Sequence, residues 1–327
     1  LVHIARAAEW SPSWLVGAEI RGAGPNGCHD GDRLILELDE SYGTFEKVIP
    51  YGLAVLNIDR DHLDHYGTYE TLAASFRGVM QRTEGPVVIW SDDVPAATHE
   101  GLRVVTVGTT DRADYVVDRL ELRPEGAVFQ LRGPQISVDI SLRVTGLHNV
   151  ANAATVAVLA HHLGATPSAI TTGLAHFPGA PRRYEHRGRL GTTEIIDDFA
   201  HLPGEIAATL RTARENGSRE LLAVFQPHRY SRTHHLLDEF GASFGDATHV
   251  VVTDIYGAGE RNDYGVTGQQ VAEAISAHRE RPATYCHSLA DVEAYVRDVA
   301  PRFDTVVFLG AGDIAELVDA LGGSRVD

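Results

Sequence analysis

The chain has 327 residues, of which 43% are hydrophobic and 22% are charged, as is typical of a folded globular protein. At about 150 residues per domain, this length predicts two domains. Its formal net charge of −17 argues against nucleic acid and anionic membranes as partners, because both carry negative charge. Two cysteines without metal-binding spacing, and no apolar run of about 18 residues, indicate a cytoplasmic protein in a reducing compartment.

The first third of the chain alternates short apolar runs with helical patterns, which predicts a mostly parallel sheet covered by helices. Residues 114–145 alternate polar and apolar side chains between two turn signals, which predicts a small antiparallel meander. We expect strands over 34–38, 53–58, 87–90 and 104–107, and helices over 69–82, 149–163 and 167–176. These elements would form a first domain over residues 1–180.

Proline, glycine and charge replace the periodic pattern in FPGAPRRYEHRG, residues 177–188, which indicates a linker. Beyond it strands and helices alternate again, which predicts a second, doubly wound α/β domain over 181–327. The expected strands are 193–197, 221–225, 249–253, 283–286 and 304–309, and the expected helices are 204–215, 234–244, 268–279, 289–299 and 313–321.

Carboxylates follow two expected strands of the first domain. Glu37, Asp39 and Glu40 end the first strand, and Asp59-Arg60-Asp61-His62 follows the second. Ligands of open parallel sheets bind beyond the carboxyl ends of the strands, and Mg²⁺ prefers carboxylate oxygens, so these ends predict a metal site that the His62 imidazole could join. The alternative is that turns and helix starts simply favour acidic residues.

Asn149 and Asn152 open an alanine-rich helix and lie three residues apart, on one face of its first turns. Their amides could bind a nucleobase edge or a phosphate, where the helix dipole helps. The same residues could equally serve a helix cap beside a buried histidine. Spacing alone does not separate these two interpretations.

The second domain carries paired arginines at its start and after its second strand. Arg182 and Arg183 lie at the linker and could reach an anionic ligand held between domains. Asp197 and Asp198, which end the next strand, could hold a ribose hydroxyl or orient an arginine. The alternative is a salt bridge between domains. In FQPHRYSRT, residues 225–233, Arg229 and Arg232 are three apart, and one helical turn would let both grip a carboxylate.

Two glycine-rich stretches, YGAGE at 256–260 and GAGDI at 310–314, are too short to specify nucleotide binding. The chain also contains no G-x-x-x-x-G-K-[ST] phosphate loop. A nicotinamide dehydrogenase would need a G-x-G-x-x-G fingerprint near the first strand of a domain, and neither domain has one.

The ordered series ELDES, NIDRDHLDHYGTYE, GLHNVANA, FPGAPRRYE, IIDDFAHLPGEI, FQPHRYSRT and DIYGAGE resembles the Mur ligases of peptidoglycan synthesis over nearly the whole chain. The resemblance implies a P-loop-type ATPase domain followed by a Rossmann-like C-terminal domain. It also implies that a UDP-binding domain and a phosphate loop precede Leu1, so we expect residues 1–327 alone to neither hydrolyse ATP nor ligate.

FQPHRYSRT and DIYGAGE resemble the family member that joins L-alanine to UDP-N-acetylmuramate. In that reaction ATP phosphorylates the lactyl carboxylate, and the amine of L-alanine attacks the acyl phosphate. Alternatives are the family member that reattaches recycled tripeptide, and a truncated module that binds without catalysis.

The resemblance also implies roles for single residues. Glu37 and His62 match magnesium ligands, and Asn149 and Asn152 match the ATP site. Arg183 matches a nucleotide-contacting arginine and Asp198 an aspartate near the ribose. Arg229 and Arg232 match the arginines that hold the amino acid's carboxylate, with His201 nearby; Glu37, His62, Arg183 and His201 form the expected catalytic set. Phe199 and Leu202 depart from the family, which usually has tyrosine and histidine there.

Overall fold

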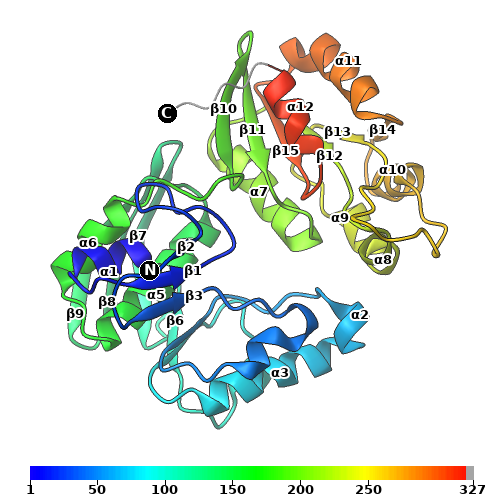
Figure 1. The fold of residues 1–327 in the computed structure, drawn as a ribbon. Coiled ribbons are helices and arrows are strands. Elements are labelled where there is room, and N and C mark those ends of the chain that lie inside the picture. Colours follow the sequence, from blue (N-terminus) through cyan, green and yellow to red (C-terminus); the bar gives the residue numbers. More distant parts are fainter. Residues whose placement is uncertain (322–327) are drawn as a thin grey trace. The chain divides into compact units, whose positions relative to one another are not determined.

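The computed structural model describes residues 1–321, with every side chain in that range except that of Asp64; residues 322–327, the end of the expected second domain, lie outside it. The chain forms two compact units, unit 1 over Leu1–Ala180 and unit 2 over Pro181–Asp327 (Figure 1). Among the described helices, none combines the length and the apolar character that crossing a bilayer requires.

Unit 1 is built on a six-stranded sheet of order β4-β5-β6-β7-β8-β9. The pairs from β4 to β7 are parallel, and β7, β8 and β9 form an antiparallel meander. The strands are β4 Leu53–Val55, β5 Val87–Trp90, β6 Val105–Gly108, β7 Tyr115–Arg123, β8 Gly126–Gly133 and β9 Ile136–Leu142. The expected parallel sheet with a meander is therefore confirmed, and the meander continues the sheet.

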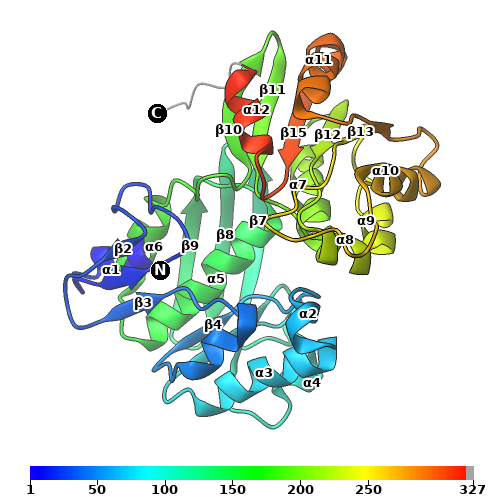
Figure 2. The ribbon, with the colours of Figure 1, turned by 45° about the vertical axis from the view of Figure 1, so that its right-hand side comes forward.

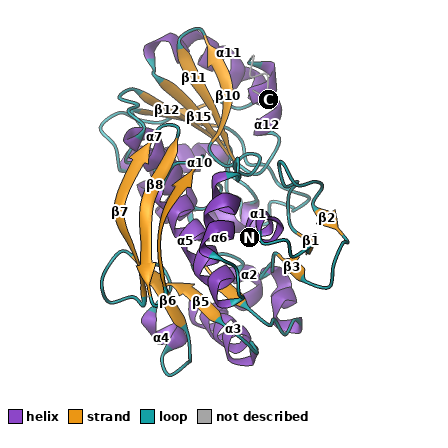
Figure 3. Ribbon diagram, turned by 90° about the vertical axis from the view of Figure 1, so that its left-hand side faces the viewer, coloured by secondary structure: helices purple, strands orange, loops and turns teal. Residues whose placement is uncertain are grey.

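Helices α5 and α6 lie against one face of this sheet, as Figures 2 and 3 show. Val150, Ala154 and Ala157 of α5 are fully buried between the sheet and α1 and α6, where small side chains let the helix approach closely. Thr166 caps α6 as expected. The helices are α1 Val2–Ala7, η1 Ser41–Lys47, α2 Leu63–Tyr66, α3 Tyr69–Arg82, α4 Ala96–His99, α5 Leu147–His162 and α6 Pro167–Ala175.

A separate three-stranded sheet of order β2-β1-β3 contains β1 Ser13–Leu15, β2 Gly27–Cys28 and β3 Leu34–Leu36. The prediction that the strand near Leu34 belongs to the main parallel sheet is wrong, because this strand pairs with β1. Leu34 is 63% exposed, whereas a strand inside a covered parallel sheet would bury both faces.

Unit 2 contains a six-stranded sheet of order β10-β11-β15-β12-β13-β14, which is parallel except for β10. Along β12, Leu221 and Phe225 pack on one face and Leu222 and Val224 on the other, so helices cover both faces, as a Rossmann-like domain requires. The strands are β10 Glu185–Leu190, β11 Thr193–Asp198, β12 Leu221–Phe225, β13 His249–Val252, β14 Thr284–Tyr285 and β15 Thr305–Leu309. The helices are α7 Pro203–Glu215, α8 Tyr230–His235, α9 Leu237–Ala242, α10 Gly268–Ala277, α11 Leu289–Val299, η2 Ala300–Arg302 and α12 Ile314–Ala320.

Two elements of unit 2 differ from the prediction. The helix expected over 234–244 is two short helices, α8 and α9, which meet at Leu236, whose φ of −113° interrupts the helix. Part of the expected linker is the edge strand β10. Its charged sequence EHRGRL lacks the apolar pattern that predicts a strand. Arg187 of this strand is 4% exposed because it pairs with Asp197 and Asp319.

Candidate active site

Three polar side chains lie close together in unit 1: those of Glu40, Asp61 and His62. All three belong to the strand ends at which the sequence predicts a metal site. Each offers one ligand atom, and these atoms lie within 4.8 Å of one another. Nε2 of His62 lies 3.3 Å from Asp61 Oδ2 and 3.7 Å from Glu40 Oε1. Burial raises the pKa of Glu40 because it disfavours the charged carboxylate. A cation bound nearby would offset this effect and favour the ionised form. Two carboxylates and an imidazole in this arrangement fit a hard divalent cation such as Mg²⁺.

The backbone around His62 holds this cluster together. His62 has a φ of 53°, in the left-handed region that few residues other than glycine adopt. Its amide donates to Asp61 Oδ1 at 2.8 Å, and Tyr66 Oη donates to the Glu40 carbonyl at 2.7 Å. The Tyr66 bond ties the segment after β4 to the loop after β3. Unusual backbone conformations such as that of His62 concentrate at functional sites.

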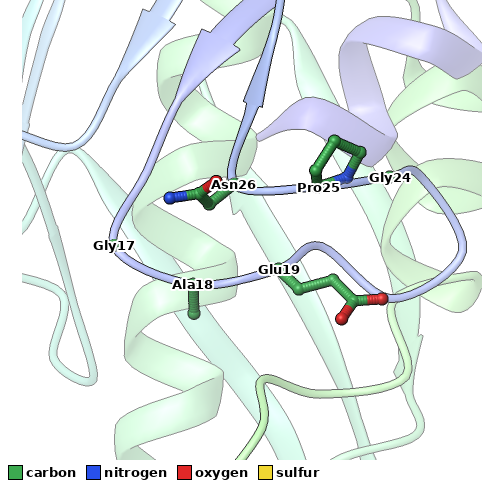
Figure 4. Close-up of a pocket in the computed structure, with 6 residues that line it drawn as sticks. All are labelled: Gly17, Ala18, Glu19, Gly24, Pro25 and Asn26. Carbon is green, nitrogen blue, oxygen red and sulfur yellow. The ribbon is translucent and has the colours of Figure 1, made fainter.

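Glu37 lies outside that cluster. Its side chain is exposed, and its Oε2 accepts a hydrogen bond from the Gly17 amide at 2.7 Å. Gly17 belongs to the loop between β1 and β2, where it lines a pocket with Ala18, Glu19, Gly24, Pro25 and Asn26 (Figure 4). A Cβ at Gly17 would lie 3.3 Å from Glu37 Oε2, so glycine permits this close approach. The metal-binding role of Glu37 stays a prediction.

The first turns of α5 present both predicted asparagines. Nδ2 of Asn149 donates to the Thr145 carbonyl at 2.8 Å, so this side chain supports the start of the helix. Gly146 is the N-cap and makes no side-chain cap bond. The half-buried Asn152 has no side-chain hydrogen bond to residues 1–321. Of the two asparagines, Asn152 therefore has the amide better placed for a nucleotide, and both ATP-binding roles stay predictions.

Asp198 in unit 2 is 4% exposed and joins two backbone segments. Oδ2 accepts from the Tyr184 amide and Oδ1 from the Ala200 amide, both at 2.7 Å. Burial raises the pKa of Asp198 to about 6. Its carboxyl thus positions the segment that carries Arg183, and its predicted contact with a ribose is not tested by these bonds.

Arg183 points its guanidinium toward solvent, with 48% of the side chain exposed. One nitrogen lies 3.3 Å from Glu205 Oε1, and the guanidinium lies 5.4 Å from the centre of the Phe199 ring. An exposed guanidinium that is held by a carboxylate and an aromatic ring can still reach a phosphate. Its nucleotide-binding role stays a prediction.

His201 follows β11 and faces both Glu205 and the loop after β12. Its Nδ1 lies 2.9 Å from the Phe199 carbonyl oxygen and 3.4 Å from Glu205 Oε2, and its ring lies edge-on to His228 at 5.8 Å. Leu202, where the family usually has histidine, is 8% exposed and packs into the hydrophobic core. This departure therefore adds an apolar side chain to the core of unit 2.

Of the two arginines of FQPHRYSRT, Arg229 ends the turn that connects β12 to α8, and Arg232 lies in the first turn of α8. Arg229 is the N-cap of α8, and its guanidinium lies 3.4 Å from Glu260 Oε1. Arg232, in the first turn of α8, is 8% exposed and donates to the His228 carbonyl at 3.1 Å. The structure thus places both guanidinium groups beyond the carboxyl end of β12, where ligands of such sheets bind.

His228, which the sequence did not single out, lies at the centre of this turn. Its ring stacks on Tyr256 with an angle of 12° between the planes, and its Nδ1 lies 3.1 Å from a nitrogen of Arg232. Burial, followed by the charges of Arg232, His201 and Arg229, lowers the pKa of His228 to about 4. The imidazole is therefore neutral at physiological pH and accepts from Arg232 through Nδ1.

This neutral histidine predicts a pH dependence of folding. The pKa of His228 is about 4 in the folded protein and 6.5 in an unfolded one, so the folded state binds fewer protons between these values. The stability from this group is complete above pH 6.5 and is lost as pH falls toward about 4. We expect the Tm of unit 2 to rise more steeply over this interval in the wild type than in His228→Gln.

The comparison with His228→Gln isolates this contribution, because Asp198 acts in the opposite direction. Its pKa is raised from 3.8 to about 6, so its contribution to stability is lost as pH rises through that range in both proteins. Calorimetry at several pH values measures the two slopes. Equal slopes in the wild type and the variant would contradict the neutral state of His228.

The geometry brings together Glu40 and Asp61 of the predicted acidic strand ends, and it adds three residues that the sequence analysis left without a role: Glu205, His228 and Glu260. Glu205 lies one helical turn after His201. Glu260 belongs to DIYGAGE, a stretch that carried the resemblance and no assigned chemistry. In the sequence Glu260 is a single carboxylate after two glycines, and this spacing alone predicts no function.

The fold and these clusters define a two-domain α/β protein with an acidic cluster in its first unit and a pair of arginines beyond a strand end in its second. Residues 29–160 match the family profile of the Mur ligase middle domain, and residues 182–312 match that of the Mur ligase glutamate ligase domain. A UDP-N-acetylmuramate–L-alanine ligase of Gloeobacter violaceus is 38% identical over 319 residues, which cover 95% of this chain and 67% of that protein. The chain therefore belongs to the Mur ligase family, which confirms the resemblance.

Solved structures agree with this assignment. The crystal structure of UDP-N-acetylmuramate–alanine ligase from Thermotoga maritima is 26% identical, with a TM-score of 0.78, and the match covers 98% of this chain and 70% of that one. A murein peptide ligase from Psychrobacter arcticus has a TM-score of 0.69 at 18% identity, over 100% of this chain and 75% of that one, which shows the shared fold.

Proposed function

We propose that the protein containing this chain joins L-alanine to UDP-N-acetylmuramate with ATP, in a step of peptidoglycan synthesis. The observation that carries the proposal is the arginine pair beyond β12, in a chain 38% identical to an enzyme named for this reaction. ATP would phosphorylate the lactyl carboxylate, and the deprotonated amine of L-alanine would displace phosphate from the acyl phosphate. Because the reaction consumes ATP, we place it in the cytoplasm.

Residues of unit 1 would serve the phosphoryl transfer. His62 with Glu40 and Asp61, or with Glu37 as the resemblance implies, would hold Mg²⁺, whose charge offsets that of the transferred phosphoryl group. The Asn152 amide, at the start of α5, would bind the nucleotide where the helix dipole favours negative charge. Asn149 would keep that first turn in place through its bond to the Thr145 carbonyl.

Residues of unit 2 would bind the amino acid. Arg229 and Arg232 would grip its carboxylate, because guanidinium groups bind carboxylates through paired hydrogen bonds. The neutral His228 would accept from Arg232 without adding a third positive charge beside the substrate's amine. His201 would lie at the edge of this cluster, and Arg183 would bind the nucleotide phosphates.

A product assay tests the proposal. The natural protein that contains this chain is incubated with ATP, Mg²⁺ and UDP-N-acetylmuramate, and either L-alanine or L-alanyl-γ-glutamyl-diaminopimelate is supplied. We expect the L-alanine adduct and one ADP for each amide formed, measured by chromatography and mass spectrometry. A preference for the tripeptide would instead identify the ligase that recycles tripeptide, and no adduct with either would indicate a module that binds without catalysis.

A further inference from the structure

Glu260 makes three contacts with the start of α8, at Arg229 and Ser231. Its Oε2 accepts from the Ser231 amide at 2.9 Å, and its Oε1 accepts from Ser231 Oγ at 2.7 Å. The guanidinium of Arg229 lies 3.4 Å from the same Oε1. One carboxylate therefore ties the N-cap residue of α8 to the first turn of that helix, and an anion at this position also favours the helix start.

The local sequence YGAGE builds the turn that presents Glu260. The Glu260 amide donates to the Gly257 carbonyl at 2.8 Å, and both Ala258 and Gly259 have positive φ, at 48° and 84°. A Cβ at Gly257 would lie 2.8 Å from Cε2 of Tyr230, so the glycine lets this turn pack closely against the Tyr230 ring of α8. The glycines that resembled a nucleotide loop thus shape a turn that carries a carboxylate.

The same loop holds the turn after β12 at a second place. The Tyr256 amide donates to the Pro227 carbonyl at 2.9 Å, and the Tyr256 ring stacks on His228. Contacts on both sides of Arg229 thus fix the backbone from which its side chain extends.

We propose that Glu260 is a positioning residue that holds Arg229 in the orientation in which it binds the amino acid's carboxylate; this rests on the proposed function. Arginine loses considerable rotamer freedom when it binds, and a guanidinium already held by Glu260 loses less. A guanidinium has five N–H donors in a fixed plane, so it can pair with Glu260 and with a substrate carboxylate together. The negative charge of Glu260 also offsets the positive charges of Arg229 and Arg232 in this partly buried turn.

The test uses Glu260→Gln in the natural protein that contains this chain. Glutamine keeps the shape and an oxygen that can accept from Ser231, and it loses the charge that holds Arg229. We expect the KM for L-alanine to rise about tenfold, with kcat, KM for ATP and KM for UDP-N-acetylmuramate within about twofold of wild type. Glu293→Gln, which breaks a remote glutamate–arginine pair on α11, is the matched control and should leave all constants unchanged.

A double-mutant cycle with Arg229→Ala shows whether Glu260 acts through that arginine. The double variant should have the KM of Arg229→Ala alone, because Glu260 then has no guanidinium to hold. A further tenfold rise of the KM for L-alanine in the double variant would overturn the inference. Parallel rises of all three KM values in Glu260→Gln, together with a lower Tm, would also overturn it, because they mark a structural role. An unchanged KM for L-alanine in Glu260→Gln overturns the inference alone, whereas a wild type that does not ligate L-alanine overturns the proposed function and the inference with it.

Discussion

We expect His62→Ala to lower kcat/KM for ligation by about 100-fold or more and to raise the Mg²⁺ concentration needed for half-maximal rate. The imidazole lies close to Glu40 and Asp61, so its removal would take away a proposed metal ligand and leave two carboxylates close together. The ligand atoms of these carboxylates lie within 4.8 Å of each other, and like charges so close raise the cost of ionising both groups, which would weaken the site further. Initial rates over a Mg²⁺ titration measure the effect in the natural protein.

The matched control is His65→Ala, because His65 is an exposed histidine on α2 outside the cluster. It should keep the wild-type dependence on Mg²⁺. A direct readout is Mn²⁺ binding followed by electron paramagnetic resonance, which His62→Ala should weaken and His65→Ala should not. A normal Mg²⁺ requirement in His62→Ala would contradict the metal site.

The same titration decides between the two candidate acidic ligands. The distances in the structure favour Glu40, which lies 3.7 Å from His62, whereas the resemblance favours Glu37, whose carboxylate accepts from Gly17. If the cluster holds the metal as it stands, Glu40→Gln raises the Mg²⁺ requirement more than Glu37→Gln does. The reverse order would show that the Glu37 side chain turns toward His62 when the metal binds.

Buried elements of the fold were predictable because burial leaves a pattern in the sequence. The runs VVIW and LLAVF form β5 and β12 with the predicted bounds, since strands covered on both faces must be apolar throughout. The strand β10 was not predictable, because Arg187 is buried only through its pairs with Asp197 and Asp319. Ion pairs of this kind leave no periodic signal in the sequence.

The candidate site was predictable in its residue types and less so in its partners. Arg229 and Arg232 lie in one turn, as their spacing indicates, because that turn is local. Their contacts with Glu260 and His228 depend on a left-handed turn at Ala258 and on the stacking of Tyr256, which spacing does not show. The cluster around His62 likewise depends on backbone with positive φ.

We expect Arg232→Ala to raise the KM for L-alanine by about 100-fold, because it would remove a charged hydrogen-bonding group worth about 1.5–3 kcal/mol to the bound carboxylate in the proposed site. Arg232 is 8% exposed and is held by His228, so its guanidinium is already oriented before the substrate arrives. The KM values for ATP and UDP-N-acetylmuramate should stay within about twofold, because neither substrate needs this group. Saturating L-alanine should restore most of kcat, as measured by coupled ADP release.

Two further variants separate the role of this guanidinium from general positive charge. Arg232→Lys keeps the charge and loses the planar pair of donors, so we expect an intermediate rise of about tenfold. Arg261→Ala removes an arginine that is 91% exposed, directly after Glu260, and should leave the KM for L-alanine unchanged. Because Arg232 also bonds to the His228 carbonyl, its loss costs some stability, and the Tm of each variant shows how much. A wild-type KM for L-alanine in a folded Arg232→Ala would show that the carboxylate binds elsewhere. If the KM rises as much in Arg232→Lys as in Arg232→Ala, the substrate requires the paired geometry of the guanidinium and not only its charge.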